Sequence, residues 1–367
     1  MKTSSPPRFK VVDYGRGLAV LLMIFVHTLW MYADKTVQND SMLGTIIHFV
    51  GKGTAAFLFL MGLSMVLSTR QSLKHDCLRG LLILAFAYVM NALKFIVPIS
   101  VFGTMPESFV NAYGWQSPLN TSQLLYLLGT GDILQMVGIS LFLIGIIRHF
   151  VANPWIILAL GLCIAAVSGE LRGLANHHEN ISYLGRLFFS NHYQVYFPIF
   201  PWMSFILFGL AFGKWLVLKN FEHKKLFDAS LIIGFAGCAI GGGFMAWDFE
   251  YHFNNFFHAG FGGVLYLIGV NMLLFYGIHR IVEARIDNPF TRFLGYLSKR
   301  VTSIYIIQWV LICWGMGIIG FNTLSAGETL AMMPVMLALS IGVQWLKEKL
   351  FSLFKRPVSK TQSATSA

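Results

Sequence analysis

Charged residues are scarce in this 367-residue chain, where Asp, Glu, Lys and Arg together make up 12% of the sequence. A soluble domain needs about 25% charged residues to cover its surface, so the composition excludes an ordinary soluble enzyme. It equally excludes a collagen, a coiled coil and a disordered tail. Hydrophobic residues instead reach 56%, and the mean hydropathy is +0.65. The composition predicts a polytopic membrane protein.

Cysteine is also rare, with four residues (Cys77, Cys163, Cys238 and Cys313) that form no Cys-x-x-Cys pair. We therefore expect neither a disulfide framework nor a metal site. Acidic residues number 16 against 27 Lys and Arg, which gives a formal net charge of +11. These cations lie in short clusters between apolar runs and form no basic face with interleaved aromatic residues, so we expect no nucleic-acid partner.

The apolar runs predict an all-α bundle of about ten membrane-spanning helices, since a bilayer core needs about 20 residues per helix. An even number of spans places both termini on the same side. The second and fifth runs are short for a span. The predicted spans are 17–33, 53–68, 79–98, 132–148, 155–168, 197–218, 229–247, 259–279, 301–320 and 330–345.

The positive charges are distributed asymmetrically about these spans. The segments on the side of the termini hold 22 of the 27 Lys and Arg, and the opposite side holds Lys35, Lys52, Lys94, Arg172 and Arg186. Cytoplasmic loops carry the excess of Lys and Arg, so both termini are expected in the cytoplasm. The chain then divides into a cytoplasmic segment (1–12), a membrane domain (13–346) and a cytoplasmic tail (347–367).

Two segments on the opposite side, 100–131 and 170–196, are long for loops. Structureless loops of that length are uncommon in compact domains. Their aromatic residues, and the run LLYLL at 124–128, favour ordered segments at the membrane interface. The last residues, 361–367, are expected to be disordered.

The first apolar run contains ionisable residues, which are costly inside a membrane and indicate function by default. Asp13 and Arg16 share a helical face, and Gly15 and Gly17 leave room for a close neighbour. His27 lies about 15 Å beyond Gly17 along a helix, near the bilayer centre. A neutral imidazole there is a candidate general base. Purely structural roles stay open for both features: Asp13 and Arg16 could form an anchoring pair, and His27 could hydrogen-bond a neighbouring helix.

Weaker polar signals open other spans. Asp132 and Gln135 have the spacing of a helix N-cap, and Tyr305 and Gln308 lie three residues apart inside the ninth span. Trp202 follows two prolines at the start of the sixth. Further polar residues, Asp248, Glu250, His252 and His258, match no metal motif and are expected to form a solvated rim. Three glycines at 241–243 favour close helix packing.

These motifs together resemble the catalytic domain of the heparan-α-glucosaminide N-acetyltransferases, a family within a broader transmembrane acyltransferase superfamily. The similar blocks come in the same order over most of the chain. They are DYGRGLA at 13–19 with MIFVH at 23–27, FLFLMGLS at 57–64, GDILQMVG at 131–138, FPIFPW at 197–202 with LFG at 207–209, and LGYLS at 294–298 with IYIIQW at 304–309.

The resemblance implies transfer of an acyl group, typically acetyl from cytoplasmic acetyl-CoA, to an acceptor on the other side that is often a sugar. It also implies that the membrane histidine is catalytic. Two departures weaken the correspondence: the lysosomal enzymes carry their catalytic histidine beyond this span, and related acyltransferases often have histidine where this chain has Gln308. An amide cannot act as a base, so proton transfer would rest with His27, or else with His48 or His192.

We therefore interpret the chain as an acyltransferase of the bacterial inner membrane. Arg16 and Arg79 would face the phosphates of acetyl-CoA or another acyl-CoA, and His27 would act as the base. The supporting residues would be Asp13, Asp132, Gln135, Trp202, Tyr305 and Gln308. We expect a carbohydrate acceptor, membrane lipid as surroundings and no metal. The alternative is a secondary transporter or exporter of a sugar or lipid-linked substrate. The acceptor's identity, the acyl chain length, the route of transfer and the oligomeric state stay open.

Overall fold

The structure is a computed structural model, and it describes residues 9–68, 72–176, 182–218 and 223–354. His177, His178 and Glu179 of the second long segment lie outside the described residues, as does the tail at 361–367. Apart from two isolated bridges, the regular elements of the described part are all helices. They are α1 (Lys10–Tyr32), α2 (Lys35–Asp40), α3 (Met42–Gly51), α4 (Thr54–Leu67), α5 (Leu73–Asn91), the π-helix η1 (Ala92–Val101), α6 (Glu107–Asn111), α7 (Thr121–Leu128), α8 (Ile133–Phe150), α9 (Pro154–Asn176), α10 (Tyr183–Phe189), α11 (Ile199–Leu218), α12 (His223–Trp247), α13 (Phe249–Phe253), the 3-10 helix η2 (Phe256–His258), α14 (Phe261–Glu283), α15 (Pro289–Ser298), α16 (Val301–Ile319) and α17 (Ala326–Phe354).

Ten stretches of the described helices are long and apolar enough to cross a membrane. This confirms the predicted all-α bundle and its number of spans. The second stretch runs over Met42–Leu67 and joins α3 to α4 across a short break, and the third joins α5 to η1. Lys52 interrupts the apolar run at the break, so hydropathy placed the start of that span at residue 53 and missed α3. The fifth span is also longer than expected, Pro154–Arg172.

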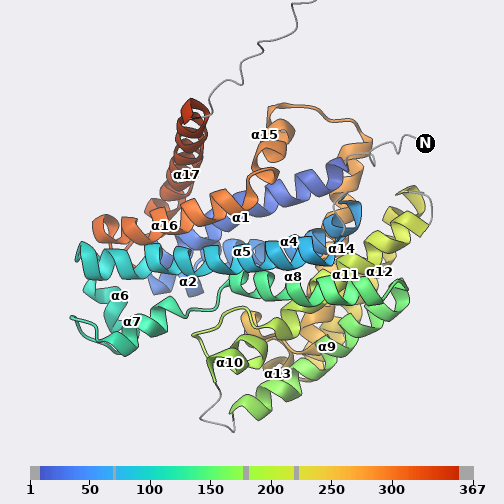
Figure 1. Cartoon of the computed structure of the whole chain (residues 1–367), viewed down its shortest axis with the longest axis horizontal. Coiled ribbons are helices and arrows are strands. Elements are labelled where there is room, and N and C mark those ends of the chain that lie inside the picture. The colour runs from blue at the N-terminus through green and yellow to red at the C-terminus, as the bar shows by residue number, and fades with distance from the viewer. Residues whose placement is uncertain (1–8, 69–71, 177–181, 219–222, 355–367) are drawn as a thin grey trace, which may run out of the picture.

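The short helices gather at one end of the bundle. In Figure 1, α6 and α7 lie at the lower left and α10 and α13 at the bottom centre, while the connections from α8 to α9 and from α14 to α15 lie at the other end, on the right and at the top. The two long segments predicted to be ordered are helical over much of their described parts, with α6 and α7 in the first and α10 in the second. These four short helices therefore surround the same end of the ten spans, whereas the short helix α15 packs on the opposite end, beside Gly17.

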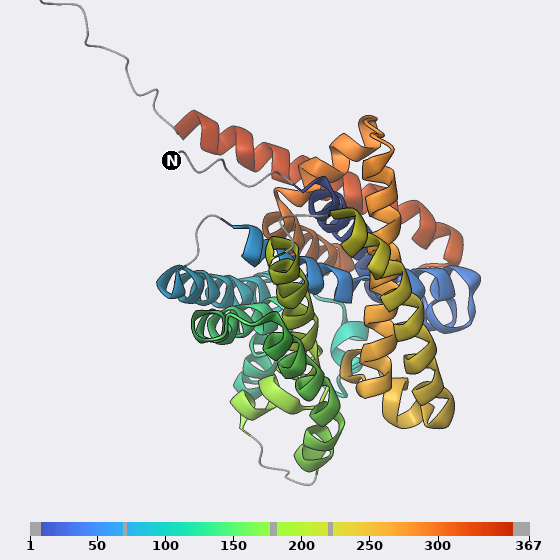
Figure 2. The same ribbon diagram turned by 90° about the vertical axis from the view of Figure 1, so that its right-hand side faces the viewer.

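Small residues let several helix backbones meet directly. A Cβ atom added at Gly62 of α4 would lie 2.0 Å from the carbonyl oxygen of Ile206, and one added at Gly209 of α11 would lie 1.9 Å from that of Phe59. Such distances leave no room for any side chain, so the two helices cross in backbone contact, as small residues permit in membrane bundles. Figure 2 shows α12 alongside α14. Of the three glycines expected to pack closely there, Gly241 does, whereas a Cβ atom at 242 or 243 would meet nothing within 4 Å.

The first helix is held against α15 in the same way. A Cβ atom at Gly17 would lie 2.1 Å from the carbonyl oxygen of Leu294, and one at Gly15 would lie 2.6 Å from a methyl group of Leu60. The close approach predicted for these two glycines is confirmed. Because α1 cannot rotate without a clash, the side chains on its other faces keep fixed directions.

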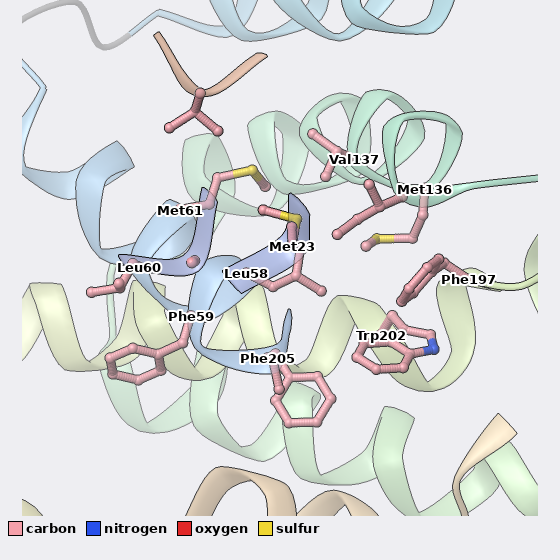
Figure 3. Close-up of a cluster of buried hydrophobic side chains, with 14 of the residues drawn as sticks. Met23, Leu58, Phe59, Leu60, Met61, Met136, Val137, Phe197, Trp202 and Phe205 are labelled. Carbon is pink, nitrogen blue, oxygen red and sulfur yellow. The ribbon is translucent and has the colours of Figure 1, made fainter. Parts of the chain in front are cut away.

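The centre of the bundle is a cluster of buried hydrophobic side chains, with members from α1, α4, α8 and α11 (Figure 3). Trp202 of α11 is fully buried there beside Phe205, and its indole N–H donates a hydrogen bond of 2.7 Å to the carbonyl of Phe257. A buried indole N–H needs such a partner. Met23 of α1 joins the same cluster (Figure 3), which fixes the depth at which the rest of α1 sits.

Candidate functional site

His27 lies in the last two turns of α1 and is 6% exposed. Its Nδ1 lies 2.7 Å from Nε2 and 3.2 Å from Oε1 of the Gln308 side chain on α16. The partner is 281 residues away in the chain. An amide can donate through nitrogen or accept through oxygen, and the choice sets the imidazole tautomer. Only when Nδ1–H donates to Oε1 is the Nε2 lone pair free to take a proton.

Aromatic rings hold the imidazole from its other sides. The ring of His27 is stacked on that of Trp309, with centroids 4.0 Å apart, and Tyr305 meets it edge-on at 6.0 Å. Trp30, one helical turn along α1, lies 5.6 Å away. Stacking and the Gln308 contact together restrict rotation of the imidazole, as a positioned base requires.

Asp132 connects the start of α8 to this group. It is the N-cap of α8 and forms a capping box with Gln135, whose Oε1 accepts a 3.0 Å hydrogen bond from the Asp132 backbone N–H. The N-cap predicted from the sequence is confirmed. Its carboxylate Oδ1 also accepts a 2.9 Å hydrogen bond from the hydroxyl of Tyr305. Asp132 therefore joins α8 to α16 one helical turn from Gln308.

The second oxygen of Asp132 pairs with Lys94, a residue that the sequence reasoning missed. Lys94 lies in η1, is 2% exposed, and its Nζ is 3.4 Å from Asp132 Oδ2. The ammonium also lies 4.3 Å from the ring centroid of Trp309. The charge count assigns Lys94 to the side opposite the termini, but it lies inside the third span. A lysine three residues after Asn91 in an apolar run was the signal that could have found it.

A cavity of about 560 Å³ opens beside these residues. It is lined by His27, Lys94 and Asp132 and by aromatic side chains from α1, α6, α7 and the segments before α11 and α14. It lies at the end of the bundle where the short helices gather. A volume of this size fits a small organic molecule. The aromatic walls and few polar groups are typical of ligand sites.

A second, narrow cavity reaches His27 from the other direction. It has a volume of about 30 Å³, and its lining follows one face of α1 through Ala19, Leu22, Met23 and Val26. That volume holds about two waters. A longer group could enter only if side chains such as Met23 move, and a flexible thioether side chain allows such movement.

Further along this direction, Arg16 lies eleven residues before His27, about 16 Å along the helix. The charges of Arg79 on α5 and of Asp13 both act on Arg16. Asp13 also accepts a 3.2 Å hydrogen bond from Ser298 of α15. The structure thus brings the predicted residues Asp13, Arg16 and Arg79 together at the end of the bundle opposite the large cavity.

Trp202 and the two alternative bases, His48 and His192, line neither cavity. Trp202 belongs to the hydrophobic cluster and reaches the site through Phe257, which lines the large cavity, and Phe197, which lines both. His48, one alternative base, accepts a 3.4 Å hydrogen bond from the indole N–H of Trp30. His192, the other, uses Nδ1 to accept from the Gln194 backbone and is exposed. Among the described residues that line the two cavities, His27 is the one histidine.

The prediction that Asp248, Glu250, His252 and His258 form a solvated rim is wrong for the two histidines. Asp248 and Glu250 are exposed, but His252 and His258 are 4% and 3% exposed. Both histidines point inward because α13, which contains His252, and the turn after it pack back on α14: His252 Nδ1 accepts from the Gly262 N–H, and His258 Nε2–H donates to the carbonyl of Val195. Within the described part of the chain, no three His, Cys, Asp or Glu side chains are placed to hold a metal ion.

The family model for the heparan-alpha-glucosaminide N-acetyltransferase catalytic domain matches residues 8–243. The chain belongs to this family. It is therefore a member of a family of membrane acetyltransferases. The match includes His27, Lys94 and Asp132 and ends before α16, so the Gln308 and Tyr305 contacts come from the structure alone. No curated protein matches the chain in a direct sequence comparison.

Proposed function

We propose that this protein transfers an acetyl or other short acyl group from acyl-CoA to an acceptor in the large cavity, with His27 as general base. The observation that supports this most is that His27 lines both cavities. A base between a donor route and an acceptor site can serve both reactants, and proximity of that kind removes much of the entropic barrier.

In this proposal His27 takes the proton of the acceptor through Nε2, so Nδ1–H must donate to Oε1 of Gln308. The Gln308 amide nitrogen is the nearer atom to Nδ1, at 2.7 Å against 3.2 Å for Oε1, so the amide group turns to present its oxygen when His27 acts as the base. Gln308 therefore selects the tautomer, and Trp309 and Tyr305 hold the ring plane. The Asp132–Lys94 pair holds α8, η1 and α16 in register beside the imidazole. Gln135 supports Asp132 through the capping box.

The donor would approach from the Arg16 end. Arg16 and Arg79 would bind phosphate groups of CoA, because guanidinium groups form strong charge-assisted hydrogen bonds to phosphate. The thioester arm would follow the Ala19–Val26 face of α1 toward His27, with Met23 moving aside. If so, Arg79→Ala should raise the donor KM about tenfold or more, since such a contact contributes about 1.5–3 kcal/mol. An unchanged donor KM would leave Arg79 as a topological anchor only.

We also propose that both termini face the cytoplasm of a bacterial inner membrane, so that the CoA end faces the cytoplasmic pool. The excess of Lys and Arg on that side supports this orientation. Reporters fused after Lys360 or within 220–225 should read as cytoplasmic, and reporters within 176–180 as external. A cytoplasmic signal from 176–180 would contradict the ten-span orientation.

The decisive experiment compares His27→Ala, His27→Gln and the control His48→Ala in purified protein. Loss of a positioned base should lower turnover of acetyl-CoA by about 10²–10⁴-fold, and acyl-CoA binding should persist because Arg16 is remote. His27→Gln should be equally impaired, since an amide keeps a hydrogen bond but accepts no proton. His48→Ala should retain turnover. Near-normal turnover in His27→Gln would exclude His27 as the base. If the unaltered protein does not turn over acetyl-CoA, the alternative function, a transporter, is favoured.

A further inference from the structure

The large cavity has an excess of positive charge. Among the described residues that line it, Lys35 and Lys94 are the cations and Asp132 is the one carboxylate. A third cation, Arg186, lies close enough to Tyr126 on the cavity wall for its charge to act on that phenol. Clefts lined by one sign of charge concentrate ligands of the opposite sign.

Asp132 is not free to bind a positively charged ligand. Its Oδ1 accepts hydrogen bonds from the Ile133 N–H at 2.7 Å and the Tyr305 hydroxyl at 2.9 Å, and its Oδ2 pairs with Lys94 at 3.4 Å. These partners come from three different elements, so a ligand ammonium group could reach the carboxylate only by displacing one of them. Among the described residues that line the cavity, no carboxylate is therefore available to bind an ammonium group of a ligand.

The ammonium group of Lys35 lies over an aromatic side chain of the cavity wall. It follows α1 by three residues, and its Nζ lies 6.0 Å from the ring centroid of Phe321, another lining residue. The neighbouring Asp34 carboxylate instead caps α2, accepting hydrogen bonds from the backbone and hydroxyl of Thr36. Lys35 is exposed as a residue, but partial burial of its ammonium group lowers its pKa, and Asp34 only partly opposes this. An anionic ligand group would offset that cost of burial.

The aromatic walls do not reverse this preference. Aromatic faces attract ammonium groups, but the cavity's own lysines already lie over several of them. Lys35 lies over Phe321, and Lys94 lies 4.7 Å from the centroid of Phe95 and 4.3 Å from that of Trp309. An amine acceptor in its protonated form would add a further cation beside these two.

We propose that the acceptor is a hydroxyl group on an anionic compound, with the negative group at Lys35 and the hydroxyl at His27. This inference rests on the proposed acyl transfer and specifies its acceptor. Five residues of α1 separate His27 from the end of the helix at Tyr32, a rise of about 7.5 Å, and Lys35 follows closely. The two groups of the acceptor would therefore lie at opposite ends of one small molecule or sugar unit.

The chemistry balances without another reactant. The hydroxyl oxygen forms a bond to the acyl carbon, and the thioester C–S bond breaks. The hydroxyl proton passes to Nε2 of His27 and then to the CoA sulfur, which leaves as the thiol. A neutral hydroxyl enters the cavity with its lone pair available, whereas an ammonium group must first lose a proton. The product is an ester, in contrast to the amide that the family name describes.

The test uses three sugars of similar ring size: glucuronic acid, glucose and glucosamine. Purified protein receives each with isotope-labelled acetyl-CoA, and mass spectrometry measures the acetylated product. Hydroxylamine distinguishes the products because it cleaves esters and leaves amides intact. We expect kcat/KM to be highest for glucuronic acid and lowest for glucosamine, with hydroxylamine-sensitive product.

Charge variants then test the role of Lys35. Lys35→Gln should lower kcat/KM for glucuronic acid about tenfold and leave glucose nearly unchanged, and Lys35→Glu should raise the glucosamine rate relative to glucuronic acid. Lys52→Gln is the matched control, because the Lys52 ammonium group also lies over aromatic rings, those of Phe49 and Phe253 among them, yet Lys52 does not line the cavity. It should behave as unaltered protein.

The outcomes separate this inference from the proposed function. Preferred acetylation of the glucosamine nitrogen, or a charge preference that Lys35→Glu leaves unchanged, would overturn the anionic hydroxyl acceptor. So would acetyl-CoA hydrolysis dependent on His27 with no ester formed on any of the three sugars, and in that case the proposed function would stand. An absence of acetyl-CoA turnover under every condition would overturn both.

Discussion

Mild acid should destabilise this protein through His258, a buried residue in the turn between α12 and α14. Its Nε2–H donates a 3.0 Å hydrogen bond to the carbonyl of Val195, and its Nδ1 has no hydrogen-bond partner among the described residues. Burial lowers the pKa of His258 from 6.5 to about 4, although the Val195 carbonyl opposes the effect. The folded protein therefore holds this imidazole in the neutral form at pH 5.

The sign and size of the effect follow from the two pKa values. Between pH 6.5 and about 4 the unfolded chain binds a proton at this histidine and the folded chain does not. The contribution of His258 to the free energy of unfolding is thus fully present above pH 6.5, and it decreases as the pH falls. Each pH unit within this window costs about 1.4 kcal/mol. From pH 7 to pH 5 the loss is about 2 kcal/mol, and it approaches about 3 kcal/mol near pH 4.

The assay is the free energy of unfolding in mixed detergent micelles at pH 7 and pH 5. His258→Asn is the comparison, since its amide N–H can donate to Val195 and it does not titrate. The difference between unaltered protein and variant should change by about 2 kcal/mol between the two pH values. Equal pH dependence in both proteins would refute the reasoning. Activity should fall in parallel, because Val195 pairs with Gly131, the residue before Asp132.

Two further predictions concern the framework of the site. Lys94→Met should lower the free energy of unfolding by about 3–5 kcal/mol, because it leaves the buried carboxylate of Asp132 uncompensated. Adding Asp132→Asn should recover much of that loss. Equal stability of the single and double variants would contradict the pairing. Gly17→Ala should cost about 1–3 kcal/mol by forcing α1 away from the backbone of Leu294. Gly295→Ala is its control, because a Cβ atom there meets nothing within 4 Å. Equal thermal unfolding temperatures for the two alanine variants would exclude the close contact between Gly17 and Leu294.

The helical spans could be predicted from the sequence because each depends on local composition. Twenty apolar residues in succession satisfy the bilayer whatever their neighbours are, so the number of spans needed no tertiary information. The N-cap at Asp132 is similarly local, since the side chain bonds to the backbone that follows it. Hydropathy missed the start of the second span, where Lys52 interrupts the apolar run, and it placed the end of the fifth span too early.

The site residues were predicted unevenly. A histidine in the middle of an apolar helix is conspicuous because desolvation makes it costly, and so His27 was found. Lys94 is buried at a similar cost, but near the end of a predicted span it could not be told from a lysine that extends to the interface. His252 and His258 stand in a polar stretch, and their inward turn depends on the segment around Val195 and on α14.

By itself, the sequence determined the ten spans, the charge asymmetry and the position of a buried histidine, because each follows from the free energy of placing a residue in lipid or water. Only the tertiary structure decided what surrounds that histidine. The partner of His27 lies 281 residues away, and the pair of Lys94 and Asp132 joins segments 38 residues apart. Which helices become neighbours depends on the fit of their surfaces, such as Gly17 against Leu294 and Gly62 against Ile206, and that fit is a property of two segments at once.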